Sequence, residues 1–223
     1  EVTEPEAFVA KSARLQAVMD IIEKIRLKGE RVLVFIEHRE MQFRFAEIVR
    51  CLYGLEKIDV INGNTPIVRR QEIVNNFQRH LVRDDGFDLL ILGPKAAGTG
   101  LTLTAATHVI HLSRWWNPAV EEQCNDRVHR IGQSRPVSVH IPMALHPDLG
   151  TQSFDCLLQS LMQRKRKLAE QALWPMGDTA QDVSGLVRDL TNQSAREKPS
   201  AVREIMYDLF ERDGLGQPEQ TSM

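Results

Sequence analysis

The chain has 223 residues, of which 42% are hydrophobic and 26% are charged, and its formal net charge is −2. This is the composition of an ordinary folded protein, so it excludes disorder along the whole chain, and the near-neutral charge excludes the strongly basic class of nucleic-acid binders. No apolar run reaches the roughly 18–20 residues that a bilayer span requires, so no membrane is expected as a partner.

The three cysteines, Cys51, Cys124 and Cys156, are odd in number and scattered along the chain. A disulfide framework is therefore not expected, and the pattern indicates a reducing compartment such as the cytoplasm. The seven histidines do not fall into a zinc-binding spacing with the cysteines, so no metal site is predicted. Because the chain begins at Glu1 without a basic and apolar leader, we interpret it as a segment of a longer polypeptide.

The first predicted elements are a lead-in, a helix and a strand. Residues 1–10 are acidic and contain proline, and we expect them to be extended. Residues 11–28 show helical spacing of apolar side chains, and the following Gly29 is typical of a helix end. The apolar side chains on this face are Leu15, Val18, Met19, Ile22 and Ile25. Residues 31–36 form a continuous apolar run, which is typical of a parallel strand that is buried on both faces.

Helical and strand patterns continue to alternate as far as residue 141. Helices are predicted at residues 41–53, 66–82 and 118–129, and strands at residues 58–61, 87–92, 109–112 and 137–141. Regular alternation of this kind predicts an α/β fold, with a doubly wound and mainly parallel sheet and helices on both faces.

A C-terminal helical extension is predicted after the last strand. Residues 153–173 have helical spacing and contain the basic run Arg164-Lys-Arg-Lys167, which is either a solvated helix end or a functional surface. A short helix at residues 200–212 and disorder at residues 213–223 are also expected. Residues 175–223 carry 5 basic and 9 acidic side chains. We therefore divide the chain into a lead-in (1–10), an α/β lobe (11–150), a helix (151–174) and an acidic, helical or disordered tail (175–223).

Candidate binding residues follow the predicted strands, because ligands of open α/β sheets bind beyond the carboxyl ends of the strands. Residues 93–103 form a glycine-rich loop, which could let backbone amides approach an anion or could simply be a tight turn. In residues 121–133, the side chains of Gln123, Arg127 and Arg130 would share one face of a helix. Two guanidiniums and an amide suit a polyphosphate, although this face could equally be solvated, with Glu122 and Asp126 pairing the arginines.

Together these segments resemble the C-terminal helicase lobe, a second RecA-like domain, of the Swi/Snf family of superfamily-two DNA-dependent ATPases. The resemblance covers residues 11–173, and its most specific part is Asp126-Arg-Val-His-Arg-Ile-Gly-Gln133 preceded by Gln123. Trp116-Asn-Pro118, the loop at residues 95–103 and Asn62-Gly-Asn-Thr-Pro66 occur in the family's order. The helix at residues 154–173 is similar to the family's brace helix. The compact lobe is more similar to prokaryotic members than to eukaryotic remodellers.

The resemblance implies a role for each matching residue. Arg127 and Arg130 would be catalytic arginine fingers. Residues beside the nucleotide, or coupling its cleft to DNA, would be Gln123, Asp126, Gly98 and Gly100. Residues that contact or flank the DNA backbone would be Thr65, Arg70, Lys95, Thr99 and Trp116. The chain departs from the family at three positions of this loop region, where Gly93 replaces a usual Ser, Ala97 a usual Gly and Thr102 a usual Asn, and at Asn62, which replaces a usual Asp.

The resemblance also implies partners and cofactors. The intact protein would use ATP and Mg²⁺ and would combine this lobe with an N-terminal ATPase lobe on double-stranded DNA. The present chain contains neither a phosphate loop nor an acidic magnesium-binding motif, so alone it would neither bind ATP tightly nor hydrolyse it. In a prokaryote the protein would associate with the nucleoid, in transcription-complex recycling or in defence against phage, between which the sequence does not choose.

Two alternatives remain open from the sequence. The lobe could belong to a strand-separating helicase, or it could be a catalytically inactive module that binds nucleic acid or protein. The acidic tail at residues 175–223 is either a linker or a docking segment for a protein partner.

Overall fold

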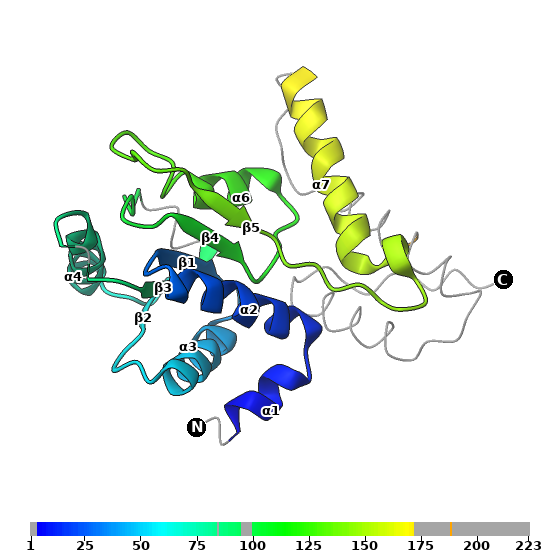
Figure 1. Cartoon of the computed structure of the whole chain (residues 1–223). Helices are drawn as coiled ribbons and strands as arrows, with labels where there is room; N and C mark the ends of the chain where they lie inside the picture. Colours follow the sequence, from blue (N-terminus) through cyan, green and yellow to red (C-terminus); the bar gives the residue numbers. More distant parts are fainter. Residues whose placement is uncertain (1–3, 84, 95–99, 172–187, 189–223) are drawn as a thin grey trace. The chain divides into compact units, whose positions relative to one another are not determined.

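The computed structural model describes residues 4–83, 85–94, 100–171 and 188, and these fall into two compact units (Figure 1). The first unit is Glu1–Ala144 and the second is Leu145–Met223. The first contains a sheet with its helices, and the second contains the C-terminal helix α7.

The centre of the first unit is a parallel sheet with the strand order β2-β3-β1-β4-β5. Its strands are β1 (Arg31–Phe35), β2 (Asp59–Ile61), β3 (Asp88–Leu92), β4 (His108–His111) and β5 (Ser138–His140). All four pairings are parallel, and Leu33 of β1 lies opposite Leu90 of β3 and Val109 of β4. The predicted parallel sheet is therefore confirmed, and the apolar run at residues 31–36 forms its middle strand because that strand is buried on both faces.

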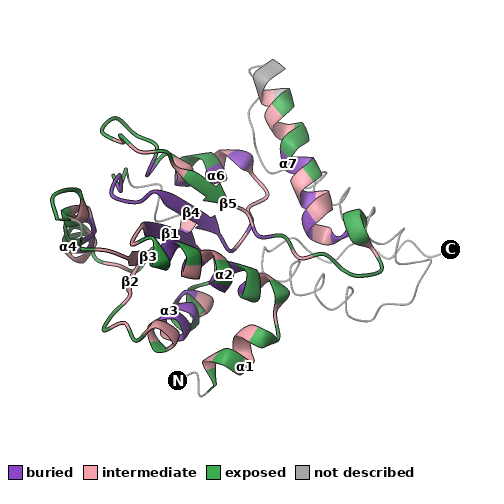
Figure 2. Ribbon diagram, in the orientation of Figure 1, coloured by how far each residue is buried: buried purple, intermediate pink, exposed green. Residues whose placement is uncertain are grey.

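Helices α2 (Ala13–Leu27) and α3 (Arg39–Tyr53) cover one face of the sheet, and both carry buried residues (Figure 2). Val32, Val34 and Ile36 point to this face, since side chains alternate along a strand. The whole predicted apolar stripe of residues 11–28 is buried here. Ser12 caps the start of α2 by accepting a hydrogen bond from the backbone N–H of Leu15.

The opposite face is covered by α4 (Ile67–Gln78), by residues 101–106 and by α6 (Pro118–Asn125). Leu33 and Phe35 of β1 point to this second core, together with Ile73 and Phe77 of α4. The helix predicted at residues 66–82 ends earlier, and its last turn is the short 3-10 helix η1 (Arg79–Leu81). Helices thus lie on both faces of the sheet, which confirms the doubly wound α/β prediction.

The prediction of an extended lead-in was wrong, because residues Pro5–Ala10 form the helix α1. Pro5 suits the first turn of a helix, where its missing N–H has no partner to lose. Phe8 and Val9 pack against the core formed by α2 and α3. This tertiary contact stabilises a segment that is too short to be helical by itself.

The second unit contains the short helix η2 (Gly150–Gln152) and α7 (Phe154–Gln171). Ser153 precedes α7, and its hydroxyl donates to the carbonyl of Gly150 at 2.6 Å and accepts from the N–H of His146 at 2.8 Å. The predicted C-terminal helical extension is therefore present, and it carries the basic run of residues 164–167. The helix predicted at residues 200–212, the tail at 213–223 and residues 172–173 lie outside the described residues. In the described part of the chain, no helix combines the length and the apolar character needed to cross a bilayer.

A buried ion pair joins the end of β4 to α6. Arg114 Nε lies 2.8 Å from Glu121 Oε1, and the two side chains are only 3% and 2% exposed. Glu121 stands in the first turn of α6, where a carboxylate is also favoured by the helix dipole. The pair fixes the start of α6, which leads into the arginine-containing motif at residues 126–133.

We predict that Glu121→Ala lowers the free energy of unfolding of the chain by about 3–5 kcal/mol, because it leaves the Arg114 guanidinium buried without its carboxylate. Urea denaturation of the 223-residue chain measures this loss. The matched control is Glu40→Ala, which removes a carboxylate bonded to Arg44 on the surface of α3 and should cost no more than about 1 kcal/mol. Equal losses in the two variants would contradict the prediction.

Two histidines and a glutamate form a chain of hydrogen bonds across β1, β4 and β5. His108 Nε2 lies 2.8 Å from Glu30 Oε2, and His108 Nδ1 lies 3.0 Å from His140 Nε2. A carboxylate only accepts, so a neutral His108 would donate from Nε2 to Glu30 and accept at Nδ1 from His140. Burial, with a smaller effect of His108, lowers the pKa of His140 below its ordinary value of 6.5.

The lowered pKa of His140 should therefore reduce the free energy of unfolding at acid pH. Below its ordinary pKa of 6.5 the unfolded chain binds a proton at His140 that the folded chain resists, so the free energy of unfolding falls until the pH passes the lowered folded pKa. We expect His140→Gln to reduce this fall between about pH 7.5 and pH 5.5, measured by urea denaturation. His129→Gln, which replaces an exposed histidine, should leave the fall as it is in the parent chain. The prediction fails if both variants follow the parent curve.

Candidate functional site

The segment after α6 is a series of turns and not a continuation of the helix. Asn117 caps α6 by accepting from the N–H of Ala119 at 3.0 Å, and Pro118 occupies the first turn. The helix ends at Asn125, four residues before the predicted end. Gln123, Arg127 and Arg130 therefore do not share one helical face, and that prediction was wrong. We call residues 126–133 the arginine loop.

Arg127 is held at the junction of α6 and the arginine loop. Its side chain is mostly buried, with an exposed fraction of 8%, and its Nε donates to the carbonyl of Gln123 at 3.0 Å. The carbonyl of Arg127 accepts from the N–H of Leu103 at 2.8 Å. Arg127 thus joins the last turn of α6 to residues 101–106, and its own lobe covers most of its surface.

Arg130 is exposed, yet three acceptors hold its guanidinium. Its Nη1 donates to the hydroxyl of Thr102 at 2.9 Å, to the carbonyl of Gly100 at 3.1 Å and to that of Leu101 at 3.5 Å. Gly100 has a φ of +75°, a conformation that favours glycine. Thr102, which stands where the family usually has Asn, still supplies a side-chain oxygen to the arginine. In the described part of the chain only Nη1 is engaged in this way, so Nε and Nη2 are available to a ligand.

Gln133 and Arg135, two residues to which sequence reasoning assigned no role, fasten the next turn. Gln133 Nε2 donates to the carbonyls of Thr104 and Ala106 at 3.0 and 2.9 Å. Its Oε1 accepts from the N–H of Arg135, and Arg135 Nη2 donates to the carbonyl of Ala105 at 2.8 Å. The sequence could have indicated a role for Gln133, because it ends the arginine motif. It gave no such indication for Arg135, which lies outside the motif.

The surface beside Arg130 carries further exposed side chains. Gln123 and Asp126, both predicted to lie near a nucleotide, are exposed. Ile131, the residue after Arg130, is a fully exposed apolar side chain. Gly98, the remaining residue of the predicted nucleotide set, lies outside the described residues. The described members of this set are therefore brought to the end of α6, the arginine loop and the segment that supports the loop.

The predicted DNA-contacting residues that the structure describes lie at the carboxyl end of a strand or on the element that follows it. Thr65 Oγ1 accepts from the N–H of Asn62 at 3.0 Å in the turn after β2, and Arg70 Nη2 donates to the carbonyl of Thr65 at 3.2 Å. Trp116 is half-buried in the segment after β4. Lys95 and Thr99 lie outside the described residues, so nothing places them beside the others.

A buried amide pair ties the ends of β1, β2 and β3 together at this edge. Gln42 Nε2 donates to the carbonyl of Ile36 at 2.7 Å, and Gln42 Oε1 accepts from Asn62 Nδ2 at 3.1 Å. Gly93 lies against this pair, and a Cβ placed on it would lie 3.1 Å from Gln42 Nε2. The Gly and Asn at positions 93 and 62, which depart from the family, therefore fit together around Gln42.

In the part of the chain that the structure describes, no metal cluster lies beside the arginines, and the thiol of Cys124 is buried. Among the described residues, no group of three or more His, Cys, Asp or Glu side chains could hold a metal ion. Burial raises the pKa of the Cys124 thiol in α6 to about 12, which leaves it protonated and unreactive. The charged groups that the lobe fixes in the arginine loop are the guanidiniums of Arg127 and Arg130.

Comparison with known proteins identifies the family to which the chain belongs. Residues 13–132, more than half of the chain, match the family model described as the helicase conserved C-terminal domain. The chain belongs to this family. Its relatives and structural neighbours place it with Swi/Snf-type ATPases, as the arginine motif indicated.

Two bacterial proteins are similar to this helicase C-terminal domain. One is YwqA of Bacillus subtilis, named as an ATP-dependent helicase/translocase, which is 34% identical over 81% of the chain and 19% of its own length. The other is the Zorya protein ZorD of Escherichia coli, which is 33% identical over 74% of the chain and 15% of its own length. The chain thus spans less than a fifth of the length of either relative.

A solved structure supports the RecA-like fold. The SWI2/SNF2 ATPase core of Sulfolobus solfataricus, in complex with double-stranded DNA, superposes with a TM-score of 0.57 and 29% identity. The match covers 74% of the helicase C-terminal domain chain and 32% of that structure. The RecA-like, doubly wound architecture predicted from the sequence is therefore confirmed.

Because Gln133 bonds to the backbone of residues 104–106, its replacement should lower the free energy of unfolding. We expect Gln133→Leu to lower the free energy of unfolding of the chain by about 1–3 kcal/mol, because the carbonyls of Thr104 and Ala106 lose their donor. Thermal or urea unfolding measures the loss. Gln123→Leu, at an exposed position of α6, is the matched control and should change stability by less than about 0.5 kcal/mol. A Gln133 variant as stable as this control would show that the two hydrogen bonds do not hold the turn.

Proposed function

We propose that this chain is the C-terminal motor lobe of a longer ATP-dependent translocase on double-stranded DNA. In this proposal the lobe supplies Arg127 and Arg130 as arginine fingers to an ATP site that it shares with an N-terminal lobe. The observation that carries the proposal is the exposed Arg130 guanidinium, which, among the described residues, Gly100, Leu101 and Thr102 hold through Nη1. Fixing a long side chain costs rotamer entropy, and a guanidinium that is already held by its own lobe pays less of this cost when it meets a ligand.

The restraint suits the chemistry of phosphoryl transfer. A guanidinium presents a planar fork of donors that matches the oxygens of a phosphate. A guanidinium that is already fixed need not be ordered when charge develops on the transferred group, and such a finger contributes about 10³–10⁵ to turnover. Arg127 is covered by its own lobe, so it would act from the base of the loop and Arg130 from its surface.

The remaining machinery would lie in the other lobe. The intact protein would use ATP and Mg²⁺, and the chain described here contains no phosphate loop to hold them. Its own contribution would be the two arginines, flanked by the exposed Gln123 and Asp126. Alone, the chain would bind ATP weakly and hydrolyse none.

The DNA would lie along the carboxyl edge of the sheet. Thr65, Arg70 and Trp116 stand there, and Lys95 and Thr99 follow β3 in the sequence. Contacts from such residues to the phosphate backbone position a protein without reading sequence, so weak sequence preference is expected. The similarity to a SWI2/SNF2 core that was solved with double-stranded DNA supports duplex DNA as the substrate. A cytoplasmic, nucleoid-associated location and a protein partner for the acidic tail are parts of the same proposal.

The test is ATP hydrolysis by the polypeptide that carries both lobes, with and without duplex DNA. We expect Arg130→Ala to reduce DNA-stimulated turnover by about 10³-fold or more, because the finger is lost, while the affinity for duplex DNA is retained. Arg130→Lys keeps the charge but not the planar fork, and it should restore little of the rate. The matched control is Arg44→Ala on α3, an exposed arginine on the opposite face of the sheet, which should leave turnover unchanged.

Three other results would contradict the proposed function or the role of Arg130. An unchanged rate in Arg130→Ala would remove this residue from the ATP site. Strand separation by the parent in an unwinding assay would favour a strand-separating helicase. Binding of duplex DNA without any hydrolysis by the parent protein would favour an inactive binding module.

A further inference from the structure

Helix α4 crosses the sheet from the predicted DNA side to the opposite edge. It follows the turn that contains Thr65, and its first turns carry Arg70, which bonds to that turn. Its 12 residues span about 18 Å at the rise of an α-helix, and Gln78 is its last residue. The buried side chains of Ile73, Val74 and Phe77 pack it against the same core as residues 101–106. One rigid helix therefore runs from the carboxyl ends of the strands to their amino ends.

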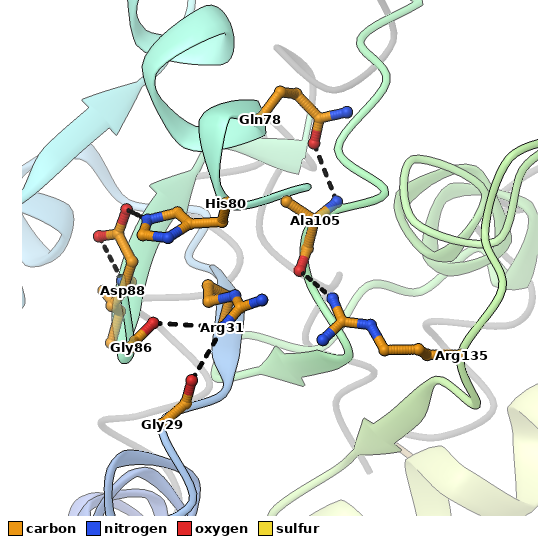
Figure 3. Close-up of polar contacts among 9 residues, drawn as sticks. Gly29, Arg31, Gln78, His80, Gly86, Asp88, Ala105 and Arg135 are labelled. Carbon is orange, nitrogen blue, oxygen red and sulfur yellow. Dashed lines mark hydrogen bonds and ion pairs between the residues drawn. The ribbon is translucent and has the colours of Figure 1, made fainter. Parts of the chain in front are cut away.

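At the far end of α4, Gln78 makes two hydrogen bonds to the segment that supports the arginine loop. Its Oε1 accepts from the N–H of Ala105 at 2.9 Å, and its Nε2 lies 3.1 Å from the hydroxyl of Thr104. Figure 3 shows Gln78 and Arg135 meeting Ala105 from two sides, one at the N–H and the other at the carbonyl. The two side chains thus hold the same peptide segment from α4 and from the end of the arginine loop.

The helix end that carries Gln78 is itself fixed to the sheet. His80 Nε2 lies 2.9 Å from Asp88 Oδ2 at the start of β3, and Asp88 Oδ1 accepts from the N–H of Leu89 (Figure 3). The position of Gln78 relative to the sheet is therefore fixed. If α4 moved relative to the sheet, the hydrogen bonds of Gln78 would move residues 104–105 with it.

We propose that Gln78 is a positioning residue that couples the DNA-facing end of α4 to the arginine loop. The route is continuous through named contacts. Arg70 of α4 bonds to the turn at Thr65, and Gln78 at the end of α4 holds Thr104 and Ala105. Gln133 of the arginine loop holds Thr104, and Arg135, just after the loop, holds Ala105. Arg130 is seated on the preceding part of the same segment, at Gly100 and Thr102. The inference rests on the proposed function, and it assigns to Gln78 the transmission of the DNA signal and not the chemistry.

The measurement is the ratio of ATP hydrolysis with saturating duplex DNA to hydrolysis without DNA, in the polypeptide that carries both lobes. Gln78→Met keeps the length of the side chain but forms neither hydrogen bond, and it should lower this ratio by about fivefold or more, the effect of one hydrogen bond on an equilibrium. Gln78→Glu keeps an acceptor for the N–H of Ala105 and can accept from the Thr104 hydroxyl, so it should restore the ratio. The matched control is Gln71→Met, an exposed glutamine of the same helix.

A merely structural role would give a different pattern. A destabilised Gln78→Met protein would lose activity in proportion with and without DNA, so its ratio would equal that of the parent, and this result would overturn the inference. An equal loss of the ratio in Gln71→Met or a failure of Gln78→Glu to restore it would overturn it as well. If the parent itself shows no stimulation by DNA, the proposed function fails first, so the two failures are distinguishable.

Discussion

The burial of β1 on both faces is the constraint on which the rest of the structure depends. This strand lies between β3 and β4, and each of its five residues is buried. A strand in this position has no solvated face, so helices must cover the sheet on both sides. The chain meets this demand with α2 and α3 on one face and with α4, residues 101–106 and α6 on the other. The loops that carry the candidate site are the connections that this arrangement requires.

Residues 100–106 are the part of the second face that links packing to the candidate chemistry. Leu101, Leu103 and Ala105 belong to the core, whereas the backbone between them serves the arginine loop. Carbonyls of this segment accept hydrogen bonds from Arg130, Gln133 and Arg135. The same stretch of chain is thus a core element and a mount for a surface arginine, which explains how an exposed guanidinium can be held in one place.

The sheet and its order of elements could be predicted because the signals were local. The apolar run of residues 31–36 and the stripe from Leu15 to Ile25 fold as their patterns indicate. The end of α6 could not be predicted, because residues 126–129 keep helical spacing in the sequence. In the structure the carbonyl of Arg127 instead accepts a hydrogen bond from the N–H of Leu103, which is distant in sequence. The helix at Pro5–Ala10 was missed for a similar reason, because Phe8 and Val9 are stabilised by residues far along the chain. In the candidate site the arginines were recognisable from their motif, whereas Gln78 has no such signal, because its partners are 26 and 27 residues away.

The burial of Cys124 has a practical consequence for labelling this lobe. A thiol whose pKa is raised to about 12 is scarcely ionised at neutral pH, and reagents that require a thiolate will pass it by. Cys51 is exposed on α3, across the sheet from the arginine loop. With Cys156 replaced by serine, one fluorescent dye on Cys51 would mark this lobe at a single point without touching the arginine-bearing face. In the proposed two-lobe protein, the distance from that dye to a second one on the other lobe would report how the two lobes move relative to each other.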